Sequence, residues 1–232
     1  MNNFNIIFPM AGESKRFDYQ FKPFLKISDV TFIELAYKYF CKYEKNINKI
    51  YFVVTQEQED NYHIKNQLSE LFDNFDMIII PEKTSGPFMT IHLALQFSQI
   101  DINKPSFICD CDHSINISPI IEQLEYLQQY DLILSVWDIK NENLNSWSKV
   151  YYEQEDNIIG FSEKELLDIS DKYHGIIGCT YFKNLSYFNH EKYLNISDGL
   201  HEVKNIKAIQ IEQAEFFGDP ERLKKTIDSR RK

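Results

Sequence analysis

Residues 4–17 read Phe-Asn-Ile-Ile-Phe-Pro-Met-Ala-Gly-Glu-Ser-Lys-Arg-Phe, and residues 22–25 read Lys-Pro-Phe-Leu. The apolar run at 5–8 predicts a buried strand, and the small residues after it predict a tight turn. In open α/β folds, ligands bind outside the carboxyl ends of parallel strands. Backbone amides of such a turn can face a phosphate, while Arg16 and Lys22 can neutralise charge on a leaving pyrophosphate. The stretch therefore predicts a phosphate-binding loop, although it lacks the spacing of a P-loop.

The rest of the chain alternates short apolar runs with helix-like segments, which is typical of βαβ units. Further strands are expected at 50–54, 77–80, 106–109 and 132–136, and paired strands at 149–152 and 158–162 around a polar turn at 154–157. Thr31 and Glu34 form a capping-box pattern, and Asp219-Pro220 predicts the start of a final helix. We expect an α/β, Rossmann-like three-layer sandwich with a mixed, mostly parallel sheet.

Length and composition set further bounds. The chain has 232 residues, of which 43% are hydrophobic, and no Gly/Ser linker divides it, so we expect one domain over residues 1–232. The net charge of -10 argues against a nucleic-acid partner, which requires clustered Lys and Arg. The four cysteines form no C-x-x-C pair, which argues against structural zinc. Without a basic leader or a long apolar stretch, we expect a cytoplasmic protein with no membrane partner. The sequence does not indicate the oligomeric state.

The expected strand at 106–109 runs into Asp110-Cys111-Asp112-His113. Acids at the carboxyl end of a strand commonly hold Mg²⁺ between phosphate oxygens, and Mn²⁺ can take its place. Asp112 is the first candidate ligand. Asp110 would lie on the same face of a regular strand, so both carboxylates can approach one ion, although Asp110 can equally cap a loop or bond an amide. His113 fits a neighbour of the site better than a ligand, because phosphate-bound Mg²⁺ prefers oxygen donors.

The loop at 11–17 with Lys22-Pro23-Phe-Leu resembles the signature A-G-x-(G/S)-x-R-F followed by K-P-x-L of the sugar-phosphate nucleotidyltransferases, or nucleotide-sugar pyrophosphorylases. The resemblance implies that Arg16 favours pyrophosphate departure and that Lys22 contacts the phosphates at the reacting centre. Alone, each of these residues would be an ordinary turn glycine or a solvated charge, and their joint spacing favours the family. The loop residues that the resemblance assigns to the triphosphate are Met10, Ala11, Gly12, Glu13 and Ser14.

Three later segments resemble the same family. Residues 82–94 resemble a turn that borders the nucleobase and opens a helix, which implies nucleotide contacts at Glu82, Ser85 and Gly86; the alternative is a plain connection between a strand and a helix. Residues 158–164 and 175–182 resemble a strand ending in E-K and a later G-x-Y-x-F strand. They imply that Lys164 grips an acceptor phosphate and that Gly178 leaves room for it; the alternative is a packed hairpin with incidental surface charge.

The resemblance also assigns Asp112 a catalytic role through magnesium, and it reveals one departure. The aspartate expected two residues before Gly218, which is usually the second metal ligand, is Phe216 here. Asp219, Glu215 or Asp110 can supply the missing charge, or the metal can rely on Asp112 and the phosphates.

Taken together, these motifs imply a nucleotidyltransferase domain with a nucleotide-binding part at roughly 1–137 and an acceptor-binding part at roughly 138–232. It would transfer NMP from an NTP, with CTP as our guess, to a small phosphorylated acceptor and release pyrophosphate. The acceptor would be a sugar phosphate or another phosphometabolite such as phosphoglutamine or phosphocholine, in surface or capsule polysaccharide synthesis.

Two other functions stay open at this point. Asp110-Cys-Asp112 also satisfies the D-x-D pattern of nucleotide-sugar-dependent glycosyltransferases, although that pattern is short. Phe216 is equally consistent with a nucleotide-binding regulator that has lost metal-assisted turnover. Arg16 and Lys22 favour nucleotidyl transfer over glycosyl transfer, because a glycosyltransferase starts with a finished diphosphate and does not have to stabilise a departing pyrophosphate.

Overall fold

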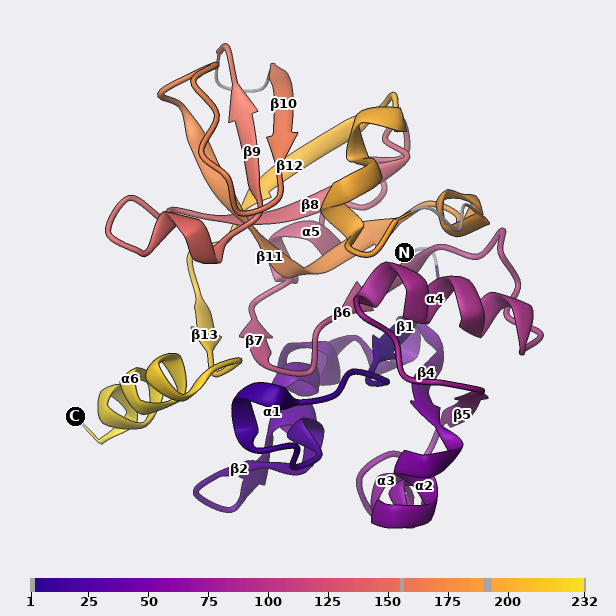
Figure 1. Ribbon diagram of the computed structural model, residues 1–232. Coiled ribbons are helices and arrows are strands. Elements are labelled where there is room, and N and C mark those ends of the chain that lie inside the picture. The colour runs from indigo at the N-terminus through magenta and orange to yellow at the C-terminus, as the bar shows by residue number, and fades with distance from the viewer. Residues whose placement is uncertain (1–2, 155–156, 190–192, 232) are drawn as a thin grey trace.

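The computed structural model describes residues 3–154, 157–189 and 193–231, so two residues of the expected turn at 154–157, Glu155 and Asp156, lie outside the described residues. Nine strands of the described residues form one mixed sheet (Figure 1). They are β1 (Phe4–Pro9), β4 (Ile47–Thr55), β5 (Phe75–Ile80), β6 (Ser106–Cys109), β8 (Leu132–Trp137), β9 (Lys149–Tyr152), β10 (Ile158–Ser162), β11 (Tyr173–Phe182) and β12 (Ile206–Gln210). Two small sheets pair β2 (Lys26–Ile27) with β3 (Val30–Thr31) and β7 (His113–Ile115) with β13 (Ala214–Phe216).

The main sheet runs in the order β10-β9-β11-β6-β1-β4-β5, and β8 joins it through β11 and carries β12. Strands β6, β1, β4 and β5 are all parallel, as the alternating strand and helix pattern predicts. Strand β11 is antiparallel to β6, β8 and β9, and these pairs make the second half of the chain mixed. The predicted mixed α/β sheet is therefore confirmed.

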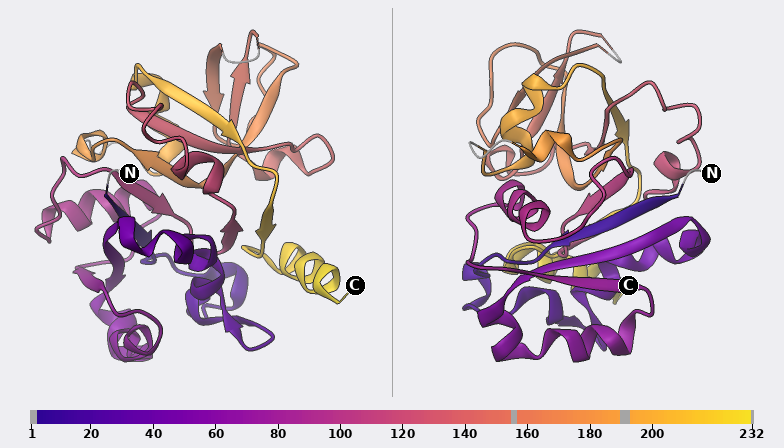
Figure 2. Two further views of the ribbon diagram at one scale, coloured as in Figure 1. Left: turned by 180° about the vertical axis from the view of Figure 1, so that it is seen from behind. Right: turned by 90° about the vertical axis from the view of Figure 1, so that its right-hand side faces the viewer.

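Helices and short 3₁₀ turns cover both faces of the sheet (Figure 2). The helices are α1 (Phe32–Tyr37), α2 (Gln56–Tyr62), α3 (Ile64–Leu71), α4 (Pro87–Gln96), α5 (Ser118–Ile121) and α6 (Pro220–Arg230). In β1, Ile6 packs in one core cluster with Leu68 of α3, whereas its neighbour Ile7 packs in another with Phe88 and Ile91 of α4. Because adjacent strand residues point to opposite faces, β1 separates two layers of core, and the three-layer arrangement is confirmed.

The expected helix starts are present. Glu34 N donates to Thr31 Oγ1 at 3.3 Å and Thr31 N donates to Glu34 Oε2 at 2.8 Å, so the capping box is complete. At α6, Arg222 N donates to the N-cap Asp219 Oδ1 at 2.9 Å. These bonds satisfy amide groups that a helix leaves without partners at its first turn.

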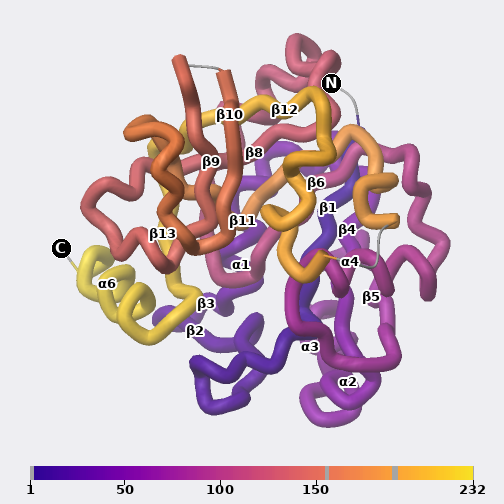
Figure 3. Tube along the Cα trace, turned by 45° about the horizontal axis from the view of Figure 1, so that its top comes forward, coloured from indigo at the N-terminus to yellow at the C-terminus, as the bar shows by residue number. Residues whose placement is uncertain are grey.

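Helix α6 lies beside the β2–β3 hairpin (Figure 3). Phe217, just before α6, joins Phe32 of α1 in a small buried cluster, and Leu25 and Leu223 pack against it. This packing brings the end of the chain back to the loop that follows β1. Within the described ranges, no helix combines the length and the apolar composition needed to cross a bilayer.

Candidate active site

A cleft of about 590 Å³ opens at the carboxyl ends of β1 and β6, between the parallel half of the sheet and the β9–β11 region. The predicted residues that line it come from five separate stretches of the chain. Eleven of the residues predicted for the site line it: Gly12, Glu13, Ser14, Arg16, Lys22, Ser85, Gly86, Asp110, Asp112, Lys164 and Gly178.

Three residues predicted to contact the nucleotide do not line this cleft. Met10 and Ala11 are 3% and 0% exposed, and their side chains pack in the core, so only backbone atoms remain for a ligand. Glu82 is exposed and lies outside the cleft lining. Nucleotide contacts at these three positions stay predictions.

Lys22 and Asp112, which are ninety residues apart, form the central ion pair of the cleft. Lys22 Nζ lies 2.6 Å from Asp112 Oδ2, and Lys22 N donates to Ser14 Oγ at 3.2 Å. Burial alone would raise the pKa of the Asp112 carboxyl, but Lys22, together with His113 and Arg16, outweighs burial and holds that pKa well below its usual range. Burial likewise opposes the charge on Lys22, but Asp112, together with Cys111 and Asp110, outweighs burial and raises the pKa of Lys22 above its usual range. Both groups therefore carry their charges at neutral pH.

Asp110, Asp112 and His113 form a cluster in which one ligand atom from each lies within 4.8 Å of the others. Asp110 N donates to Gly178 O at 2.7 Å, and Gly178 N donates to His113 Nδ1 at 3.2 Å, so β11 fixes the cluster from behind. Burial and the nearby Asp112 carboxylate raise the pKa of Asp110. Two close carboxylates facing a cleft are the donor set that Mg²⁺ prefers, so these residues fit the predicted metal.

Two glycines allow this cluster to pack. A Cβ on Gly178 would collide with Asp110 Oδ2, and a Cβ on Gly218 would collide with Asp112 Oδ2. Gly178 was predicted to leave room for an acceptor, and the neighbour that it accommodates in this structure is the Asp110 carboxylate.

Phe216 stands where the resembling family has an acid, and it is surrounded by rings. Strand β13 pairs it with His113, and its ring lies edge-on to His113 at 5.1 Å, Trp137 at 5.5 Å and Trp147 at 5.0 Å between centroids. Such edge-to-face contacts stabilise an apolar wall beside the carboxylates.

Of the three acids that we considered as replacements, the structure brings Asp110 to Asp112. Glu215 Oε1 accepts a hydrogen bond from Arg230 Nε at 2.7 Å, and Asp219 caps α6. Both of those carboxylates therefore have partners outside the cluster.

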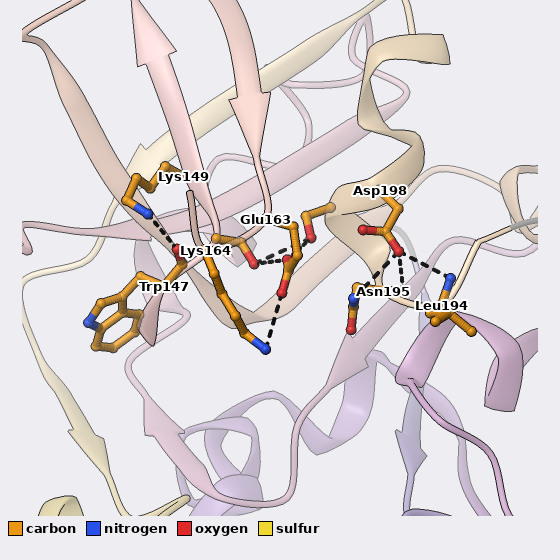
Figure 4. A network of polar contacts seen from close by, with 9 residues as sticks. Trp147, Lys149, Glu163, Lys164, Leu194, Asn195 and Asp198 are labelled. Atoms are coloured by element: carbon orange, nitrogen blue, oxygen red, sulfur yellow. Dashed lines mark hydrogen bonds and ion pairs between the residues drawn. The ribbon is translucent and has the colours of Figure 1, made fainter. Parts of the chain in front are cut away.

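Lys164 reaches the cleft from the turn after β10 (Figure 4). Its side chain is 56% exposed, and its Nζ lies 3.6 Å from Glu163 Oε1. The other Glu163 oxygen accepts hydrogen bonds from the hydroxyls of Ser148 and Ser197. This wall of the cleft therefore offers hydroxyls, a carboxylate and an ammonium group.

The sequence did not predict Gln58 and Arg222 as residues that shape the site. Gln58 Nε2 donates to Met10 O at 3.2 Å and to Gly12 O at 3.1 Å, so α2 holds the shape of the loop. Its signal was present, because Thr55-x-x-Gln58 is a capping-box pattern, and this box is formed. Arg222 lines the cleft with its guanidinium carbon 4.2 Å from the Trp147 ring, a long-range contact that no local pattern predicts.

The chain shares its fold with nucleotidyltransferases of known structure. A nucleoside-diphosphate-sugar pyrophosphorylase from Vibrio cholerae RC9 matches 96% of this chain over 99% of its own, with a TM-score of 0.75 and 21% identity. A UDP-glucose pyrophosphorylase solved with UDP-glucose matches all of this chain over 99% of its own, with a TM-score of 0.77 and 16% identity.

An inositol-1-phosphate CTP transferase from T. maritima matches 98% of the chain over 96% of its own, with a TM-score of 0.75 and 11% identity. No family model matches the sequence, and no curated protein does. At these identities the similarity shows a shared fold, and the fold expected from the resemblance is confirmed.

Proposed function

We propose that this chain is a nucleotidyltransferase that transfers NMP from an NTP to a small phosphorylated acceptor and releases pyrophosphate. The observation that carries the proposal is the 2.6 Å pair between Lys22 and Asp112, which joins the loop after β1 to the acids after β6 inside the cleft. The shared fold of the two pyrophosphorylases and the CTP transferase supports it.

In the proposed reaction, an acceptor phosphate oxygen attacks the α-phosphorus while the bond to the β-phosphate oxygen breaks in line with it. The protein supplies positioning and charge rather than a nucleophile. Arg16 and Lys22 neutralise the charge that develops on the departing pyrophosphate, and the Gly12 turn brings backbone amides to the triphosphate. Lys164 orients the attacking phosphate from the opposite wall.

Asp110 and Asp112 would hold Mg²⁺ or Mn²⁺, because their carboxylates share one cluster at the end of β6. Such an ion would supply positive charge close to the reacting phosphates. Lys22 would then interact with two anionic groups. It forms an ion pair with Asp112 in this structure, and it would also contact phosphate oxygens in the substrate complex.

For the nucleotide and acceptor we propose CTP and a sugar phosphate or a phosphometabolite such as phosphoglutamine or phosphocholine, in the cytoplasmic supply of precursors for surface polysaccharide. The shared fold of the inositol-1-phosphate CTP transferase supports a cytidylyl transfer on this architecture. The hydroxyls of Ser148 and Ser197 around the Glu163 carboxylate support a polar acceptor that offers hydrogen-bond donors.

The test incubates purified protein and Mg²⁺ with each of CTP, UTP, ATP, GTP and dTTP against pooled phosphorylated acceptors. Pyrophosphate release and product mass are followed, and Lys22→Ala serves as the inactive control. We expect one NTP and acceptor pair to give pyrophosphate together with a product of the summed mass less pyrophosphate. Near-normal release by folded Lys22→Ala would contradict the assignment.

The same assay, run also with nucleotide sugars in place of the NTPs, separates the two alternatives. A glycosyltransferase would release nucleoside diphosphate from a nucleotide sugar and no pyrophosphate from any NTP. A regulator would bind an NTP tightly and release no pyrophosphate across the whole panel.

A further inference from the structure

The turn that carries Lys164 has an uncommon backbone conformation. Lys164 has a φ of 63°, in the left-handed region that residues with a Cβ rarely adopt. The chain leaves β10 just before it, and Glu165 N donates to Glu163 O at 2.8 Å across the turn. A non-glycine residue persists in this region only when its surroundings hold it there. Contacts outside the turn are therefore needed to keep Lys164 in place.

Three side chains donate to one carbonyl next to Lys164, and we call them the carbonyl clamp. Glu165 O accepts hydrogen bonds from Ser162 Oγ at 2.6 Å, Lys149 Nζ at 3.1 Å and Tyr151 Oη at 3.3 Å. A carbonyl oxygen has two lone pairs, so three donors saturate it. Tyr151 Oη also accepts a hydrogen bond from Leu167 N at 2.9 Å, which fixes the chain beyond the turn.

The clamp follows from the two-residue period of β9. Lys149 and Tyr151 lie on one face of the strand, and Ser162 of β10 is paired with Lys149. Val150 lies between them, points to the opposite face and packs in the core cluster that contains Phe88. Side chains on one face of β9 therefore hydrogen-bond to the turn, and Val150 on the other face packs in the core.

Lys149 is the uncommon member of the clamp, because its side chain is 0% exposed. Its Nζ donates to Trp147 O at 2.9 Å (Figure 4). It also donates to Glu165 O, so both hydrogen bonds go to main-chain carbonyls. Burial lowers the pKa of Lys149, while the Glu163 carboxylate opposes that shift. Burying an ammonium group costs free energy that an apolar side chain would not. What the charge provides is a bridge between two cleft-lining segments, at Trp147 and at 163–164.

We propose that Lys149 is a positioning residue, which holds the Lys164 turn through the carbonyls of Trp147 and Glu165 so that Lys164 and Glu163 face the acceptor. This inference rests on the proposed function, which assigns the acceptor to that wall. Lys149 touches no substrate and acts through the backbone of the turn.

Hydrogen exchange of the full chain without ligand tests the proposal directly. In Lys149→Met, a buried apolar side chain of similar length replaces the donor, and we expect faster exchange over residues 163–167 with β1 unchanged. Tyr151→Phe should have a similar effect, because it removes a clamp donor and the acceptor of Leu167 N. Val150→Ala is the matched control from the opposite face of β9. It should lower the melting temperature and leave exchange at 163–167 as in the wild type.

Two exchange results would overturn the proposal. One is folded Lys149→Met with wild-type exchange at 163–167, and the other is Val150→Ala with the same local effect as Lys149→Met. Neither result depends on turnover, so exchange decides the clamp even if the wild-type protein releases no pyrophosphate and the proposed function fails.

Kinetics with the NTP and acceptor pair found in the panel then test the consequence. We expect Lys149→Met to raise KM for the acceptor roughly tenfold while KM for the NTP stays unchanged, because the affected lysine binds the acceptor. In a Lys164→Ala background, Lys149→Met should add no further increase. An equal rise in both backgrounds would show that Lys149 does not act through Lys164.

Discussion

The pair between Lys22 and Asp112 gives the sharpest prediction for both stability and turnover, through a double-mutant cycle of Lys22→Met and Asp112→Asn. The charged atoms are 2.6 Å apart, and the side chains are 26% and 11% exposed. At that separation and an effective dielectric of about 20, the Coulomb attraction is about 6 kcal/mol. Desolvation of two largely buried groups offsets much of it, and we expect a coupling energy of about 2 to 3 kcal/mol.

Lys22→Met should be the more damaging single change for stability, because it leaves the Asp112 carboxylate buried without its cation. The double variant should be more stable than the sum of the single changes indicates, since neither charge is then left unpaired. Urea unfolding of the four proteins measures the coupling energy.

Turnover separates the chemical role of the pair from its structural role. All three variants should lose pyrophosphate release by a factor of about 100 to 1,000, as expected when one electrostatic group of an active site is removed. Recovered stability with lost activity in the double variant is the expected combination. Additive losses of stability would refute the coupling, and near-normal turnover in folded Lys22→Met would refute the role in phosphate chemistry.

Three further outcomes are expected. Gly218→Ala should lower both the melting temperature and turnover, because its Cβ would collide with Asp112 Oδ2. A Cβ on Gly12 meets nothing within 4 Å, so Gly12→Ala should have the melting temperature of the wild type. Hydrogen bonding and charge from Arg230 lower the pKa of Glu215 below its ordinary 4.5, so this pair stabilises the fold above that pH and the effect is lost as the pH falls through the lowered pKa. The unfolding free energies of Glu215→Gln and wild type should therefore differ by about 1 kcal/mol at pH 7 and converge in acid; a difference that persists at low pH would contradict this. Chelation of divalent cations should abolish pyrophosphate release, and added Mg²⁺ should restore it; turnover unaffected by the chelator would remove the metal from the site.

The sequence was most informative where local chemistry decides the structure. The expected strands at 106–109, 149–152 and 158–162 match β6, β9 and β10 in full, because apolar runs bounded by polar turns have few alternatives. The other expected strands extend by one to three residues at an end, since pairing with a neighbour continues beyond the apolar run. The Thr31 capping box could also be predicted, because both of its hydrogen bonds join residues within four positions of each other.

The sequence could place Lys22 and Asp112 in the same region, because the carboxyl ends of neighbouring parallel strands lie at one edge of the sheet. It could not predict the contact between them. Contacts that depend on how distant segments pack were out of reach. Nothing near Lys149 in the sequence indicates that its Nζ reaches Glu165 O, and nothing near Arg222 places it on Trp147. Met10 and Ala11 show a limit of motif matching, because a matched loop residue can turn its side chain into the core.

Because Phe216 supplies no carboxylate, the charge of the cluster has to come from the acids after β6. A ring at this position packs against His113 and Trp147 and adds no charge, so Asp110 and Asp112 are the carboxylates that the described residues gather in the cluster. The two carboxylates come from one short turn rather than from two strands, and Gly178 and Gly218 must stay small for both to fit. The geometry of a bound ion would then depend on that turn, which β11 holds through the Asp110 N to Gly178 O hydrogen bond. If the cluster binds the proposed ion, the packing of Gly178 and Gly218 against the two carboxylates would control its geometry as directly as the identity of the ligands does.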